Sequence, residues 1–167
     1  VRHARRRFQE QALAGADLEA ATNELLTIYR TNNQPTRKLR ALWCLYSINA
    51  VSEKWLTQQL NHPNEHIRLW AVQLLVDSPS RSNNVGKVLS KLARIESSPL
   101  VRLFLASAMQ KLPQAQRWEL ANSLANHPDD LNDRVQPLMV WYGIEPAVLA
   151  APSKALELAR TPVNPTI

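Results

Sequence analysis

Apolar residues recur along this chain at intervals of three and four positions, the spacing of one face of an α-helix. Residues 67–76 carry two such stripes side by side, interrupted only by Arg68 and Gln73. A helix that is apolar on nearly every side must be covered on several sides, so we expect an inner helix here. The segment 85–94 has one apolar stripe and a basic opposite face, which predicts an outer helix.

The same pattern predicts alternating inner and outer helices throughout the chain. The expected ranges are 1–14, 18–28, 36–50, 52–60, 67–76, 85–94, 100–112, 114–126, 135–142 and 153–160. We expect Ser52 to cap one of these helices at its N-terminus, and Gly143 and Pro146 to end the helix that begins near Val135. All five tryptophans lie on apolar stripes and are expected in the core: Trp43, Trp55, Trp70, Trp118 and Trp141.

An apolar residue followed by arginine recurs near the start of successive inner helices. The pair occurs at Val1-Arg2, Leu39-Arg40, Ile67-Arg68 and Val101-Arg102, and Asp133-Arg134 begins a fifth segment in the same phase. The arginines are 38, 28, 34 and 32 residues apart, a mean of 33. The turn Asn61-His62-Pro63-Asn64 also returns as Asn126-His127-Pro128-Asp129. Such a period predicts an α-solenoid of about five helical hairpins.

Composition agrees with an all-α fold in a single domain over residues 1–167. Of the 167 residues, 45% are apolar and only three are glycine, which argues against disorder and against a β fold rich in tight turns. Eleven prolines then serve to separate helices. No apolar run reaches the roughly 18 residues that span a bilayer, so we expect no membrane insertion by this segment. The abrupt start of the first helix favours a fragment of a larger protein.

No residue pattern indicates catalysis, a metal site or a cofactor. The single cysteine, Cys44, excludes an internal disulfide and lies in an apolar helix that would raise its pKa. His62 and His66 are separated by Pro63 and the turn, so we do not expect them to share a helical face as metal ligands. His62 and His127 are better explained as turn residues that hydrogen-bond exposed helix ends. No nucleophile motif or glycine-rich phosphate loop is present. The carboxylates Asp129, Asp130 and Asp133 are best explained as helix caps, which favourably meet the helix dipole.

Arg40, Arg68 and Arg102 are the candidate functional residues. Stacked repeats would place them in a row on the concave side, where they could bind a carboxylate or phosphate. They could equally form a structural ladder by bonding the carbonyls and acids of a neighbouring turn. We favour the ladder, because each repeat carries the arginine whatever the ligand.

The net charge of +6 leaves a second function open. Residues 1–40 and 41–120 each carry +4, whereas residues 121–167 carry −2. A basic surface could bind nucleic acid in a concave groove, with an affinity that falls steeply with salt. The charges are mostly scattered singly, which favours an ordinary solvated surface.

The hairpins with Val/Ile/Leu-Arg at the start of an inner helix resemble HEAT and HEAT-like repeats. More narrowly, Leu39-Arg40-Ala41-Leu42-Trp43, His66-Ile67-Arg68-Leu69-Trp70-Ala71, Val101-Arg102-Leu103-Phe104 and Pro137-Leu138-Met139-Val140-Trp141-Tyr142-Gly143 resemble the HEAT-repeat region of large membrane-bound dehydrogenases of planctomycete-type bacteria. In that family the region accompanies a propeller resembling sugar dehydrogenases and a haem-binding cytochrome c module. The resemblance implies an extracytoplasmic location and a parent protein with redox activity.

Together these features predict a right-handed superhelix of HEAT-like, armadillo-like hairpins that is not itself an enzyme. Its expected role is a scaffold for protein–protein interaction, a docking or spacer region for other modules of the same chain or for a partner protein. Nucleic-acid binding is the main alternative. A catalytic solenoid resembling the HEAT-like lyases of bilin attachment would need acids or bases gathered in the groove, and no such group is evident.

Overall fold

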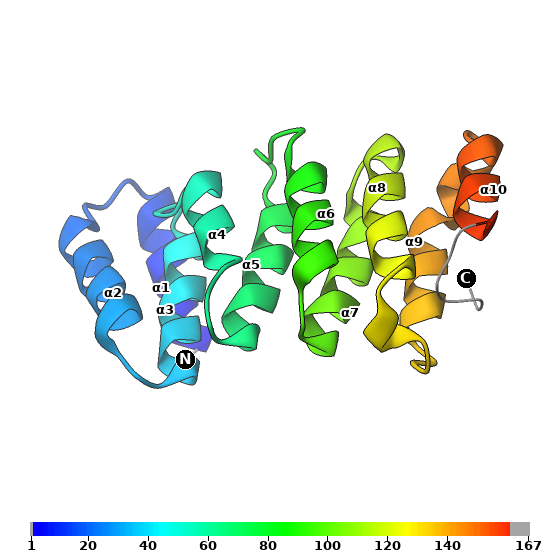
Figure 1. Ribbon diagram of the computed structural model, residues 1–167. Helices are drawn as coiled ribbons and strands as arrows, with labels where there is room; N and C mark the ends of the chain where they lie inside the picture. The colour runs from blue at the N-terminus through cyan, green and yellow to red at the C-terminus, as the bar shows by residue number, and fades with distance from the viewer. Residues whose placement is uncertain (1, 161–167) are drawn as a thin grey trace. The chain divides into compact units, whose positions relative to one another are not determined.

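The computed structural model describes residues 2–160, and the side chains of Arg2 and Ala4 are not among those described. Residues 2–160 form ten α-helices, two short 3-10 helices and no strand (Figure 1), which confirms the all-α prediction. The elements are α1 (Arg2–Leu13), α2 (Glu19–Thr31), α3 (Pro35–Ser47), α4 (Glu53–Gln59), α5 (Glu65–Asp77), α6 (Val85–Ile95), α7 (Pro99–Ala108), η1 (Met109–Lys111), α8 (Gln114–Ala125), η2 (Pro128–Asp130), α9 (Gln136–Val148) and α10 (Pro152–Arg160). Val1 lies outside the described residues.

The chain divides into two compact units, Val1–Trp70 and Ala71–Ile167, with the boundary inside α5. In the first unit α3 packs against both α2 and α1. The expectation of a single domain stays a prediction. No helix among the described residues is long and apolar enough to cross a membrane.

Helices of the second unit contact the next helix and the next but one. The helix α6 packs against α7 and α8, α7 packs against α8 and α9, and α10 packs against α8 and α9 (Figure 1). Contacts between alternate helices place α6 beside α8 and α7 beside α9. This packing of consecutive pairs is consistent with helical repeats.

Short polar signals set the helix starts. Ser52 accepts the backbone N–H of Trp55 at 3.2 Å, which confirms it as the N-cap of α4. Ser98 caps α7 in the same way through the N–H of Val101, and Pro99 takes the first helical position, where a missing N–H costs nothing. Caps and prolines therefore define the hairpin turns.

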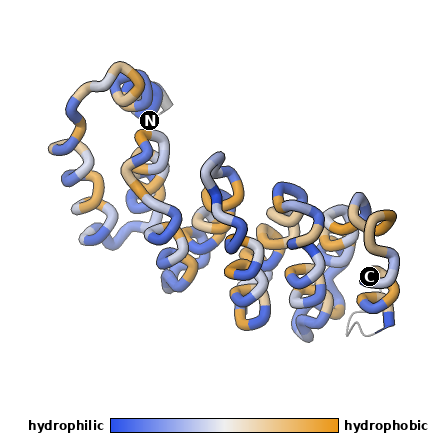
Figure 2. The backbone as a smooth tube through the Cα atoms, turned by 90° about the horizontal axis from the view of Figure 1, so that it is seen from above, coloured by the Kyte–Doolittle hydropathy of each residue, from blue (hydrophilic) through white to orange (hydrophobic). Residues whose placement is uncertain are grey.

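The expected difference between inner and outer helices is confirmed at α5 and α6. Seven apolar residues of α5 are less than 9% exposed: Ile67, Leu69, Ala71, Val72, Leu74, Leu75 and Val76. In α6, by contrast, Lys87, Lys91 and Arg94 are exposed opposite a buried stripe. Figure 2 shows hydrophobic and hydrophilic residues alternating along the helices in this way.

The prediction that Gly143 and Pro146 end a helix is wrong, because α9 continues through both to Val148. A Cβ at Gly143 would lie 2.8 Å from Met109 Cε and 2.9 Å from Met109 Cβ. Glycine is therefore needed for the close approach of α9 to η1 rather than as a stop. The carbonyl of Gly143 accepts a 2.8 Å hydrogen bond from Arg117 Nη1, which ties α9 to the first turn of α8.

The expectation that all five tryptophans lie in the core is wrong at Trp141 of α9. Val135, Leu138 and Tyr142 are 53%, 53% and 52% exposed, and Trp141, expected in the core, is 41% exposed. The buried face carries Gln136, Pro137, Val140, Gly143, Ile144 and Ala147. Its small residues let the helix approach its neighbours closely, so packing distance overrides side-chain hydrophobicity in choosing the buried face.

Candidate functional site

Arg102 lies in the first turns of α7 and is the most deeply buried charged residue of the predicted arginine set. Only 1% of its surface is exposed. The cap at Ser98 begins the helix at Pro99, so position 102 falls on the inward face beside Val101 and Leu105. A buried guanidinium requires compensation, because an isolated charge is strongly disfavoured in a low-dielectric interior.

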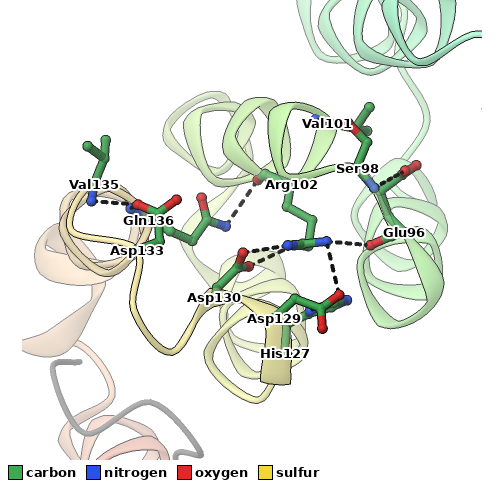
Figure 3. Close-up of polar contacts among 10 residues, drawn as sticks. All are labelled: Glu96, Ser98, Val101, Arg102, His127, Asp129, Asp130, Asp133, Val135 and Gln136. Atoms are coloured by element: carbon green, nitrogen blue, oxygen red, sulfur yellow. Dashed lines mark hydrogen bonds and ion pairs between the residues drawn. The ribbon is translucent and has the colours of Figure 1, made fainter.

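The compensation comes from segments on both sides of α7 (Figure 3). Arg102 Nε donates to Asp130 Oδ2 at 2.7 Å and Nη2 donates to Asp130 Oδ1 at 2.5 Å. This bidentate pairing matches the planar fork of arginine to a carboxylate. Arg102 Nη1 donates to the carbonyl of Glu96 at 2.9 Å and lies 4.0 Å from Asp129 Oδ2. The backbone carbonyl of Arg102 accepts a 3.2 Å bond from Gln136 Nε2.

The carboxylates of the His127 turn divide between two structural roles. Asp130 is buried and forms an ion pair with Arg102, a role that the sequence pattern did not predict. Asp133 Oδ1 accepts the N–H groups of Val135 at 2.7 Å and Gln136 at 3.0 Å, at the start of α9. These bonds to the charged form lower the pKa of Asp133.

Arg68 makes the same local contact as Arg102. Its Nη1 donates to the carbonyl of His62 at 2.9 Å and to that of Pro63 at 3.1 Å. The first bond spans six residues, like that between Arg102 and Glu96. The two arginines are 34 residues apart in the chain, so the contact recurs with the period of the hairpins.

The third predicted arginine, Arg40, lies in a different environment. Its side chain is exposed and has no hydrogen bond or ion pair with any described residue. It lines a cavity between α2 and α3. The sequence pattern therefore groups three arginines that the structure separates. Arg68 and Arg102 donate to turn carbonyls, whereas Arg40 lines the cavity.

The expected fifth arginine position is shifted in register. Arg134 precedes α9 and is exposed, whereas the residue 34 positions after Arg102 is the buried Gln136. The amide of Gln136 bonds back to the Arg102 carbonyl. A neutral amide needs less compensation when it is buried, which explains how the position can lose its charge and stay in the core.

Two arginines outside the pattern also donate to backbone carbonyls. Arg117 donates to the carbonyls of Leu112 at 2.8 Å, Gly143 at 2.8 Å and Gln110 at 3.1 Å, and burial lowers its pKa. Arg81 donates to the carbonyls of Val76 at 3.1 Å and Lys111 at 2.9 Å. In both cases one acceptor lies five residues earlier, near the end of the preceding helix. This spacing is the sequence signal that could have identified them.

The histidines of the two matching turns differ. His62 Nδ1 accepts the N–H of Asn64 at 3.0 Å, and burial together with Lys38 and Arg68 lowers the pKa of His62. His127 is buried and its Nδ1 has no hydrogen-bond partner among the described residues. Within residues 2–160 no three His, Cys, Asp or Glu side chains come together in a group that could hold a metal ion.

No protein-family model matches the chain, and neither a curated protein nor a solved structure shows significant similarity to it.

Proposed function

We propose that this chain is a non-catalytic helical-repeat scaffold that binds protein. The recurring arginine contact at a 34-residue interval and the packing of α6 on α8 and of α7 on α9 support HEAT-like hairpins. The right-handed superhelix expected from the sequence is part of this proposal. The buried ion pair of Arg102 and Asp130 serves to join segments, so the docking surface must be sought elsewhere.

The exposed apolar face of α9 carries the proposal. We define this face by Val135, Leu138, Trp141 and Tyr142, which are each more than 40% exposed. Leu138, Trp141 and Tyr142 lie three, six and seven residues after Val135, which places all four side chains on one side of the helix. Single exposed apolar residues are ordinary on a protein surface, but two aromatic and two aliphatic side chains gathered on one helical face are typical of an interaction site.

The composition of this face favours a protein over nucleic acid. Tryptophan and tyrosine are the residues most enriched among those that dominate binding energy in protein interfaces. Apart from the exposed Arg134, which directly precedes this face, residues 135–149 contain no lysine or arginine, and their one charged residue is Glu145. Binding of a phosphate backbone would require cations beside the aromatic rings.

The resemblance to dehydrogenase-associated repeats suggests which proteins would bind. We infer that the partner is another module of a multidomain, extracytoplasmic redox protein. In that arrangement the repeat unit holds modules in place and leaves the chemistry to them.

Site-specific photo-crosslinking tests the docking face. A photoreactive amino acid at Leu138 should give a discrete adduct with a partner protein in cells that produce the chain. The same group at Lys91, an exposed position on α6, is the control. The adduct partner, once purified, should bind the wild-type chain and bind the variant W141A/Y142A at least tenfold more weakly. Equal labelling from both positions, no adduct from Leu138, or unchanged affinity of the variant would reject the proposal.

A further inference from the structure

A shallow cavity of about 280 Å³, open to solvent, lies between α2 and α3 within the first unit. Its lining consists of Leu25, Ile28, Asn32, Arg37, Arg40, Ala41 and Cys44. The apolar side chains form its walls, and two guanidinium groups and one amide supply its polar groups. This composition, an apolar wall with a few convergent polar groups, is typical of small-molecule sites.

The two arginines carry uncompensated positive charge. Arg37 and Arg40 are three residues apart on α3, so they are neighbours on the helix surface. Neither side chain has a hydrogen bond or ion pair with a described residue, and α3 contains no acidic residue. Arg5 also contributes positive potential at Cys44. Burial raises the pKa of the Cys44 thiol, and the charge of Arg5 partly offsets that rise.

The remaining polar group of the cavity is also a donor. Asn32 Oδ1 accepts the backbone N–H of Gln34 at 2.9 Å, which fixes the amide with its oxygen toward the backbone. The NH₂ group of Asn32 then has no acceptor among the described residues. All the polar groups of the lining can therefore donate to an anion, and none carries a negative charge at neutral pH.

We propose that this cavity binds a small aliphatic monocarboxylate. The carboxylate lies between Arg37 and Arg40, which donate charge-assisted hydrogen bonds to it, and the hydrocarbon chain packs on Leu25, Ile28 and Ala41. The site is separate from the α9 face and goes beyond the scaffold function. Its volume is just below the usual range for ligand pockets, which suits a small ligand, and its lining has no aromatic side chain on which a nucleobase could stack.

The single cysteine supplies a direct probe. Cys44 lines the cavity and is the only cysteine in the chain, so its alkylation by iodoacetamide reports occupancy of this site alone. Octanoate at ten times its dissociation constant should slow alkylation about tenfold, since only the free protein reacts. Octanol, which has the same chain without the charge, should protect Cys44 far less.

Arginine variants test the role assigned to the charges. R37Q and R40Q should each weaken octanoate binding about tenfold in calorimetry, the effect expected for loss of a hydrogen bond to a charged group. R134Q removes an exposed arginine in the other unit and should leave the affinity unchanged. For each variant, the rate of Cys44 alkylation is measured with and without octanoate and the ratio of the two rates is compared. A change in the intrinsic reactivity of Cys44 affects both rates equally and so does not alter the ratio.

Several results would overturn the proposal. They are a failure of octanoate to bind, equal protection by octanol and octanoate, or unchanged affinity in both R37Q and R40Q. Protection by a short leucine-ended peptide in the absence of protection by octanoate would also overturn it and would assign the cavity to a peptide chain end. None of these measurements depends on the α9 face, so the scaffold proposal stands or falls separately.

Discussion

Two residues with left-handed backbone end helices of the first unit. Gly15 has φ of 74° and follows α1, and Asn49 has φ of 56° and follows α3. At both ends the next N–H bonds to the carbonyl five residues back, from Ala16 to Gln11 at 3.0 Å and from Ala50 to Leu45 at 2.9 Å. This is the Schellman arrangement, and it explains why α3 ends at Ser47 and not at the predicted Ala50.

Replacement of Asn49 tests this helix end. N49A should lower the free energy of unfolding by about 1 kcal/mol, because a Cβ without a local polar partner disfavours left-handed backbone. N49G should leave stability equal to wild type or higher, since glycine adopts this conformation freely. Urea denaturation measures both. A larger loss in N49G than in N49A would contradict the interpretation.

The stability of the first unit should fall at alkaline pH because of Tyr29. Its hydroxyl donates to Gln59 Oε1 at 2.7 Å, and burial raises the pKa of Tyr29 from 10.0 to about 12. The folded state therefore holds this proton more tightly than the unfolded state does. The resulting stabilisation is complete below pH 10 and is lost as the pH rises towards 12.

The measurement is urea denaturation of wild type and Y29F across this pH range. The wild-type free energy of unfolding should fall by about 2 kcal/mol relative to that of Y29F, which cannot ionise at this position. The other groups that titrate at alkaline pH are common to both proteins. Parallel pH profiles for the two proteins would show that Tyr29 does not contribute.

At the level of elements, buried polar bonds join helices that apolar packing alone would leave free to slide. Arg102 connects the end of α6, the start of α7 and η2 through Glu96 and Asp130. Close crossings between helices also depend on glycine. A Cβ at Gly86 of α6 would lie 2.9 Å from Gln116 Cβ of α8, so the approach of these helices depends on the missing side chain.

Removing only one member of the ion pair between Arg102 and Asp130 should lower the free energy of unfolding strongly. R102M leaves the Asp130 carboxylate buried without the guanidinium and should cost about 3–5 kcal/mol of unfolding free energy. R102M/D130L removes both charges and should recover most of that loss, because an apolar pair of similar volume needs no compensation. Chemical denaturation of the single and double variants measures the difference. Equal losses in both variants would indicate that the backbone contact to Glu96, not the ion pair, dominates.

At the scale of the whole molecule, the total of 20 lysine and arginine residues overstates the number of cations available to a ligand. Arg6 pairs with Glu10, Arg94 with Glu119 and Lys111 with Asp77, while Arg102 is buried against Asp130. Several cations are thus neutralised locally within each unit. The unpaired Arg37 and Arg40 lie beside a small cavity, which suits a compact anion better than a polymer.

Binding to duplex DNA tests this view of the charge. Fluorescence anisotropy of a labelled generic duplex should show weak binding at low salt and none at physiological salt, because a few scattered cations release few counterions. Binding in the micromolar range that persists at physiological salt would contradict the expectation and would favour the nucleic-acid alternative. In that case R68Q and R40Q would show whether the predicted arginine positions are responsible.

The sequence alone determined that the chain is helical, the inner character of α5 and the outer character of α6, since these depend on periodicities of a few residues and on local caps. The arginine that recurs at positions 68 and 102 was also visible in the sequence. Tertiary structure decided what periodicity cannot express. It buried Arg102 in an ion pair with Asp130 and placed Arg40 in the lining of a cavity. It also turned the small residues of α9 inward and Trp141 outward, because the distance between neighbouring helices, set by Gly143 against Met109, determines which face can be buried.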